Sequence, residues 1–235
     1  MTLAEAISSF IRLTTQKESP SEGPPESSPQ ARSLAQSLEL LTEYFSGTDT
    51  IDSITAERLR EFLARWYVEK AGSSPTPGPH ILLDSLSQFF RWAGEHDKAT
   101  AANDRLDVIR ELDRSIPLAL EITEKLSKQI AERGGAFTFP EFLTSFEGGG
   151  QSQFDLGAPG KLGAIEGYFR ILRVEGTAIE AVDTISEERV WPIIFPSAVA
   201  SLIGAGFIIN LELVLSSEGW QVAGCGFTYP PGAVF

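Results

Sequence analysis

The sequence predicts an α+β protein in which an N-terminal all-α bundle precedes a C-terminal small five-stranded β-barrel. Three observations carry this prediction. Apolar residues recur at helical spacing up to residue 134, β-branched and aromatic residues dominate after residue 161, and a Gly-rich stretch separates the two patterns. At 235 residues the chain is long enough for two modest domains. The expected parts are a short helix with a flexible linker, a helical bundle, a connector and the barrel, over residues 1–30, 31–134, 135–160 and 161–235.

The first part combines an amphipathic helix with a Ser/Pro/Glu-rich stretch. Residues 2–13 place Leu3, Ile7, Phe10 and Ile11 on one helical face. Residues 15–30 have too few apolar side chains to fold and are typical of a linker. Such a helix can dock on its own domain, swap onto a second copy of the chain or capture a partner, and we favour docking on its own domain or on a symmetry mate.

The bundle is expected to hold four or five helices. One begins at residue 31 and ends before Gly47, and the next begins at Thr55, whose side chain suits an N-cap. Gly94 is expected to end a third helix, and Pro117 to kink or restart the long stretch from 103 to 133. In the connector, four phenylalanines are too apolar for a free linker and are expected to contact a neighbouring domain: Phe137, Phe139, Phe142 and Phe146.

Two helical patterns of the bundle resemble a known family. Ile-Thr-Ala-Glu-Arg-Leu-Arg-Glu-Phe-Leu from residue 54 and Leu-Ser-Gln-Phe-Phe-Arg-Trp from residue 86 are similar to helices of the core-binding module of tyrosine recombinases of the phage-integrase type. That module contains helices of the forms ITPEDLREFL and LSALRSFFRFL. The resemblance covers about residues 34–96 and implies a SAM-like helical fold.

The resemblance does not extend to recombinase activity. A recombinase needs a following domain with an Arg, a His-x-x-Arg box and a nucleophilic Tyr, but the two histidines, His80 and His96, both precede residue 100. In the family, basic residues lead into the second helix and contact DNA, whereas residues 74–84 contain no Arg or Lys here. Arg58, Arg65 and Arg91 remain as candidate contact residues, although interleaved glutamates favour i,i+4 pairing on a solvated helix.

After residue 161 the pattern predicts strands over 165–174, 178–185, 189–195, 207–215 and 220–229 and a short helix over 196–203. Five short strands with a helix before the fourth are typical of an SH3-like or OB-like barrel. Tyr168, Trp191 and Trp220 are candidates for stacking on a partner or on bases, although such residues ordinarily belong to a barrel core. The uncharged run 190–211 contains Pro, Gly and Asn, so we interpret it as strand, helix and strand, and membrane association is not expected.

The chemistry of the chain excludes several functions. The net charge is −13 with no basic block, which argues against a large nucleic-acid footprint. A single cysteine, Cys225, excludes an internal disulfide and a Cys-based metal cluster, and its apolar surroundings indicate a buried side chain. We find no nucleotide-binding loop, metal-ligand spacing or catalytic constellation, and therefore expect no cofactor and no enzymatic activity. The N-terminus lacks the positive charge of a signal peptide, so a cytoplasmic location is expected.

These observations favour a non-enzymatic protein-interaction or adaptor protein, whose partner is another protein or a second copy of the chain. The alternative is a nucleic-acid-associated accessory protein that uses the recombinase-like module and the barrel, which the charge disfavours. Basic residues gathered on one face would favour this alternative, and a uniformly acidic surface would count against it. An enzyme with an unrecognised site is a third hypothesis, and it requires a deep pocket with convergent polar groups.

Overall fold

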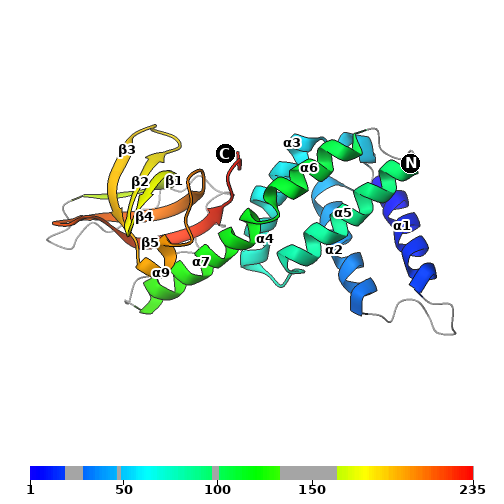
Figure 1. Cartoon of the computed structure of the whole chain (residues 1–235), viewed down its shortest axis with the longest axis horizontal. Coiled ribbons are helices and arrows are strands. Elements are labelled where there is room, and N and C mark those ends of the chain that lie inside the picture. The colour runs from blue at the N-terminus through cyan, green and yellow to red at the C-terminus, as the bar shows by residue number, and fades with distance from the viewer. Residues whose placement is uncertain (19–28, 47–48, 97–100, 133–162, 235) are drawn as a thin grey trace, which may run out of the picture. The chain divides into compact units, whose positions relative to one another are not determined.

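The computed structural model describes residues 1–18, 29–46, 49–96, 101–132 and 163–234. The chain divides into two compact units, which we call the helical unit (Met1–Pro117) and the sheet unit (Leu118–Gly232). The predicted α+β class is confirmed, since helices form the N-terminal part and a five-stranded sheet the C-terminal part (Figure 1). The boundary between the two units lies at Pro117/Leu118, whereas the bundle was predicted to end at residue 134. The four connector phenylalanines and most of the proposed linker lie outside the described residues.

The described residues of the helical unit form four longer helices, one helix that a π-turn divides, and the start of α7. Their bounds are α1 (Leu3–Glu18), α2 (Pro29–Phe45), the 3-10 turn η2 (Ile51–Ser53), α3 (Ala56–Glu61), the π-turn η3 (Phe62–Trp66), α4 (Tyr67–Ser73), α5 (Pro79–Glu95), α6 (Ala102–Leu112) and the start of α7 (Ser115–Glu132). Helix α2 begins at a proline, the residue best suited to a first helical position. The chain leaves helix α6 at Leu112 and restarts at Ser115, two residues before Pro117, as that proline predicts.

Thr55 caps helix α3 as the sequence indicates, because its Oγ1 accepts a hydrogen bond from the Arg58 amide at 3.2 Å. The π-turn that follows was not predicted. Its additional residue rotates the remainder of the helix by about 100°. As a result Tyr67 is fully buried, while Trp66 is half-buried.

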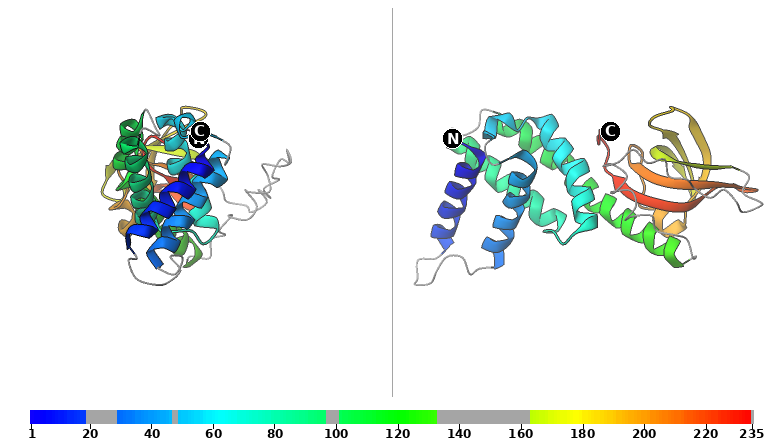
Figure 2. Two further views of the ribbon diagram at one scale, coloured as in Figure 1. Left: turned by 90° about the vertical axis from the view of Figure 1, so that its right-hand side faces the viewer. Right: turned by 180° about the vertical axis from the view of Figure 1, so that it is seen from behind.

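Helix α1 packs against α2 and α5 of the same chain (Figure 2). A capping box begins it: the Thr2 amide donates to the Glu5 carboxylate at 2.9 Å, and the Glu5 amide donates to the Thr2 hydroxyl at 3.3 Å. Phe10 is 4% exposed, with its ring 5.6 Å from that of Phe89 and 5.5 Å from that of Trp92. The apolar face predicted for this helix is therefore buried in the helical unit.

Gly94 does not end helix α5 but lies in its last turn, where α5 and α6 approach closely. A Cβ atom at this position would lie 2.9 Å from the Cβ of Ala102, which is closer than side chains pack. The small residue is therefore required by a helix–helix contact rather than by a helix stop.

The sheet unit contains β1 (Ala164–Glu175), β2 (Ala178–Asp183), β3 (Arg189–Ile194), α9 (Ser197–Ala200), β4 (Ile208–Ser216) and β5 (Gly219–Tyr229). The strands pair in the order β1-β2-β3-β5-β4, and β4 pairs with β1, so the pairing returns to its first strand. The pairs are antiparallel except β3 with β5, which is parallel and joins two residue pairs. All five strands and the short helix before the fourth were predicted from the sequence.

Helix α7 covers the inner side of this sheet with its C-terminal part. Ala119, Ile122, Leu126 and Ile130 recur at helical spacing and belong to the same buried cluster as the sheet core. This contact explains why residues 118–132 belong to the sheet unit. The uncharged run 190–211 forms strand, short helix and strand as expected, and no helix among the described residues is long and apolar enough to cross a membrane.

Candidate functional site

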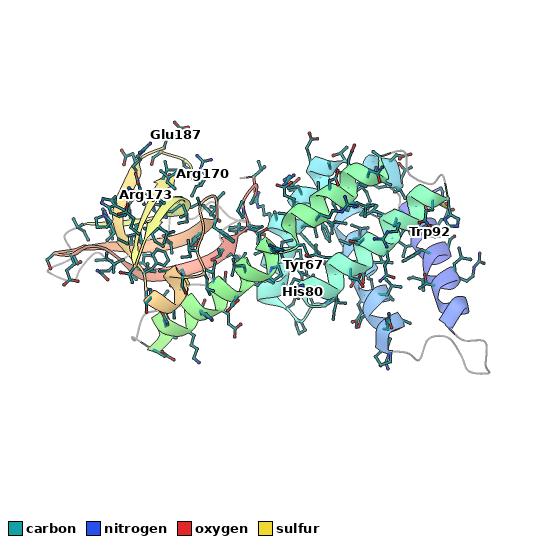
Figure 3. The ribbon with its side chains drawn as sticks, in the orientation of Figure 1. Tyr67, His80, Trp92, Arg170, Arg173 and Glu187 are labelled. Atoms are coloured by element: carbon teal, nitrogen blue, oxygen red, sulfur yellow. The ribbon has the colours of Figure 1, made fainter. Side chains whose placement is uncertain are left out.

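The outer face of β1, β2 and β3 carries a cluster of charged and aromatic side chains in two cross-strand rows. We call it the arginine–tryptophan face, and its members are Arg170, Arg173, Glu180, Val182, Arg189 and Trp191. In the first row Arg170 is paired with Val182, and Val182 with Arg189. In the second row Arg173 is paired with Glu180, and Trp191 lies on β3. Directly paired residues of antiparallel strands point to the same side of a sheet, so the rows share one face. Figure 3 labels Arg170 and Arg173 in this part of the sheet.

Arg173 lies at the centre of the contacts on this face. Its guanidinium pairs with the Glu175 carboxylate at 2.6 Å and with Glu180 at 3.2 Å, and its Cζ lies 5.2 Å from the centre of the Trp191 ring. Arg189 reaches Glu180 from the other side, at 3.3 Å. The Glu180 side chain is only 17% exposed because two guanidiniums cover it, whereas the Arg189 side chain is 74% exposed. The network therefore holds Trp191 and Arg173 in place while leaving cationic surface open to solvent.

An exposed apolar turn adjoins the face. The Trp191 side chain is 41% exposed, and Ile185, in the turn between β2 and β3, is 82% exposed. The Asp183 carboxylate orders this turn by accepting hydrogen bonds from the Ile185 amide at 2.8 Å and the Ser186 amide at 2.7 Å. A fixed turn that presents a large apolar side chain is typical of a contact surface rather than of a core.

The structure separates the three aromatic residues that the sequence analysis grouped as candidates. Trp191 lies on the arginine–tryptophan face, whereas Trp220 is partly buried against the sheet core. Tyr168 is half-buried, with its ring 6.1 Å from that of the buried Tyr229. Of the three, Trp191 is the one whose ring contacts an arginine of this face, Arg173. Sequence spacing alone did not distinguish it from the other two, since all three lie in strands.

The three arginine candidates of the helical unit do not form a common surface. Arg58 donates to the Ser53 carbonyl at 2.9 Å, and its guanidinium lies 4.9 Å from the centre of the Phe45 ring. Arg65 pairs with Glu69 at 3.4 Å, which is the predicted i,i+4 contact. Arg91 is exposed on α5. Arg58 and Arg65 thus hold contacts within the unit itself.

A second aromatic cluster lies between α2 and the π-turn. The Tyr44 ring is 5.4 Å from that of Phe62 and 5.6 Å from that of Trp66, and the Lys70 ammonium lies 5.5 Å from the centre of the Trp66 ring. Burial, together with the neighbouring Glu61 carboxylate, raises the pKa of Tyr44 to about 12. The phenol therefore stays neutral and serves as a hydrogen-bond donor to Glu61.

Arg105 is a buried charge that sequence reasoning missed. Its side chain is 2% exposed, and its guanidinium donates to the Ile54 carbonyl at 2.5 Å and to the Ile51 carbonyl at 3.0 Å. These are the carbonyls of the first residue of the 3-10 turn η2 and of the residue that follows the turn. Burial lowers the pKa of Arg105, although Asp52 and Asp104 oppose that change. Arg105 lies at helical spacing from the buried Ala102, Ile109 and Leu112, but a charged residue at such a position is ordinarily interpreted as solvent-facing.

A polar seam joins α7 to β5 within the sheet unit. The Thr228 amide donates to the Thr123 hydroxyl at 2.8 Å, and that hydroxyl donates to the Ala119 carbonyl at 3.1 Å. One helical turn further on, the Ser127 hydroxyl lies 3.6 Å from the Cys225 sulfur. Cys225 is 2% exposed, as the sequence predicted, and burial raises the pKa of its thiol to about 11. A thiol that stays protonated at neutral pH is a poor nucleophile.

We expect the Cys225 thiol to make the stability of the sheet unit depend on alkaline pH. The pKa rises from 9.0 in the unfolded chain to about 11 in the fold, so the stabilising contribution is complete below pH 9 and is lost as the pH rises through about 11. Two pKa units correspond to at most about 3 kcal/mol. The free energy of unfolding should fall more steeply across this range for the wild type than for Cys225→Ala. Identical slopes would contradict the burial of the thiol.

Among the residues that the structure describes, no three His, Cys, Asp or Glu side chains are placed to hold a metal ion. A hollow of about 390 Å³ opens between α1, α2 and α5 in the described part of the helical unit. Its lining includes Leu34, His80, Ile81 and Asp84. The Asp84 carboxylate in this lining accepts a hydrogen bond from the side-chain amide of Gln88, on the same helix, at 2.8 Å. That carboxylate serves a local helix contact.

Comparisons with protein-family models, with curated proteins and with solved structures found no match for this chain.

Proposed function

We propose that this chain is a non-enzymatic protein-interaction protein and that the arginine–tryptophan face is its contact surface. This proposal rests mainly on Trp191, whose ring contacts Arg173 and which is still 41% exposed. Tryptophan and arginine are the residues most enriched among the energetically dominant positions of protein interfaces. A tryptophan already fixed by its neighbours loses little conformational entropy on binding. A second copy of the chain belongs to the same class of partner, as does a different protein.

The non-enzymatic part of the proposal rests on how the polar groups are engaged. Arg60 holds the Glu111 carboxylate through two contacts of 2.7 and 2.6 Å, and this hydrogen bonding lowers the pKa of Glu111. That pair joins α3 to α6 and is structural in character. The thiol of Cys225 is buried and protonated. We accordingly propose no catalytic role and no cofactor. A cytoplasmic location is part of the same proposal and rests on the sequence alone.

A nucleic-acid accessory function is the second candidate, and one specific observation favours it. The three arginines of residues 164–232 lie on one face beside an aromatic ring. We further propose that the sheet is a small barrel of the OB type, because five strands with a helix between the third and fourth characterise that fold. The helical unit would correspond to the recombinase-like module. Arg173 and Arg189 both pair with Glu180, which leaves few cations to neutralise phosphates. This pairing argues against nucleic-acid binding.

The proposal predicts that Trp191→Ala removes bound partners. The wild-type chain, immobilised and exposed to native cell extract with and without nuclease, should retain proteins that survive nuclease and are lost from Trp191→Ala. Truncation of an interface tryptophan typically weakens binding by 2 kcal/mol or more, about thirtyfold. Ile81→Ala is the matched control, since Ile81 is 46% exposed in the helical unit. Retention of the same proteins by Trp191→Ala would contradict the proposal, and their loss on nuclease treatment would favour the second candidate.

A further inference from the structure

We propose that the arginine–tryptophan face binds an acidic, extended polypeptide segment that carries an aromatic side chain. This inference rests on the proposed protein-interaction function and names the chemistry of the partner.

The positive charge of the sheet is confined to this face. Residues 164–232 contain three basic residues, Arg170, Arg173 and Arg189, against eight acidic ones. All three side chains share one face, although the strands they occupy have two faces each. Complementary charge selects partners and speeds their encounter. Because the exposed Glu187 and Glu188 lie in the adjoining turn, what this face offers to an acidic partner is its individual guanidinium groups rather than a net cationic surface.

The first row offers two guanidinium groups separated by an apolar side chain. Arg170 and Arg189 lie on either side of Val182, two strand spacings apart, which is roughly 10 Å. Arg170 has no ion-pair partner in the described part of the chain, and the Arg189 side chain is 74% exposed. The Arg170 guanidinium can therefore bind a carboxylate in the two-point geometry that arginine provides. Arg189 already donates to Glu180 and has an exposed side chain that can contact a second carboxylate. Val182, 9% exposed, lies between the two arginines.

The second row offers an anchor for an aromatic side chain. Trp191 is stacked with Arg173, which two carboxylates hold in turn. The exposed remainder of the ring can contact an incoming aromatic side chain, and such pairs contribute beyond their buried area. Ile185 extends the apolar surface at the adjoining turn.

The position of Glu180 favours a polypeptide over a nucleic acid. Its carboxylate lies between Arg173 and Arg189, and with Glu175 it reduces the net charge of the cluster to +1. A nucleic-acid strand carries a phosphate at every nucleotide and would bring charge close to Glu180 wherever it crosses the face. A polypeptide can place acidic residues over Arg170 and Arg189 and an aromatic residue over Trp191, and so avoid that carboxylate.

The test is a titration of the full chain into a fluorescent peptide of alternating Glu and Phe, followed by anisotropy. A peptide of alternating Gln and Phe and a labelled oligothymidylate are the comparison probes. Arg170→Glu and Trp191→Ala should each weaken binding of the Glu–Phe peptide about tenfold or more, because one reverses an interface charge and the other removes the anchor. Arg91→Glu is the matched control, since Arg91 is an exposed arginine of the helical unit, and it should bind as the wild type does. Thermal unfolding of each variant verifies that it folds.

Three outcomes would overturn the inference: no binding of the Glu–Phe peptide to the folded wild type, equal affinity of Arg170→Glu, or tighter binding of oligothymidylate with the same dependence on Arg170 and Trp191. The last would assign the face to nucleic acid. If extract proteins are retained through Trp191 while the acidic peptide is not bound, the interaction function stands and only the partner chemistry is wrong.

Discussion

Replacing Arg105 with methionine should destabilise the helical unit by about 3 kcal/mol. The guanidinium donates to two buried carbonyls, those of Ile51 and Ile54, and each hydrogen bond to a charged group contributes roughly 1.5–3 kcal/mol. Removing the charge also removes its desolvation cost, which offsets part of the loss. Methionine retains the bulk against the Phe90 ring, whose centre lies 5.7 Å from the guanidinium carbon. Equilibrium unfolding in urea measures the change.

Two companion substitutions separate charge from geometry. Arg105→Lys keeps a cation but loses the planar guanidinium that reaches two carbonyls at once. It should therefore lower the free energy of unfolding, but by less than Arg105→Met does. Arg110→Met lies on the same helix, where the Arg110 side chain is 71% exposed, and should change stability by about 0.5 kcal/mol or less. Similar costs for Arg105→Met and Arg110→Met would contradict a structural role for the buried guanidinium.

Arg105 also shows where sequence reasoning stops. The helical spacing of α6 was clear from its apolar residues, but a charged residue beside that stripe is ordinarily interpreted as solvent-facing. Its burial depends on carbonyls more than fifty positions earlier in the chain. A contact of that kind depends on the packing of two helices, which a pattern along one helix does not specify.

The strands were predictable for the opposite reason. Each has a local signature of β-branched and aromatic residues between turn residues, and the bounds of all five agree with the sequence to within about two residues. The closed order of pairing was suggested only by analogy, because it depends on which strands meet across the sheet. The π-turn at Phe62–Trp66 left no local signal, since its extra residue is visible only as the exchange of Trp66 for Tyr67 in the core.

Of the arginine–tryptophan face, one residue was predicted from the sequence. Trp191 was predicted as a contact residue because it is an aromatic residue in a strand, whereas the arginines around it were not predicted. Their effect comes from register: Arg170, Val182 and Arg189 are distant in sequence and adjacent across the sheet. The low count of basic residues therefore concealed their concentration on one face.

Phe10→Ala should destabilise the helical unit by about 3–4 kcal/mol and expose the surface beneath helix α1. The Phe10 side chain is 4% exposed and contacts the rings of Phe89 and Trp92, and truncation of a buried phenylalanine typically costs 3–5 kcal/mol. Leu13→Ala is the control, because Leu13 lies on the same helix but is 40% exposed, and it should change stability by less than about 1 kcal/mol.

The same pair of variants tests whether α1 belongs to its own chain. If the helix docks in cis, the destabilisation by Phe10→Ala is independent of protein concentration, since no association step contributes to folding. If instead the helix is exchanged between copies, the wild type should gain stability as concentration rises, and Phe10→Ala should shift light scattering from dimer to monomer. Because the Leu3 amide donates to the Asp49 carbonyl at 2.6 Å and Phe10 packs on α5, the contacts anchor both ends of the buried stripe. We therefore expect the concentration-independent result.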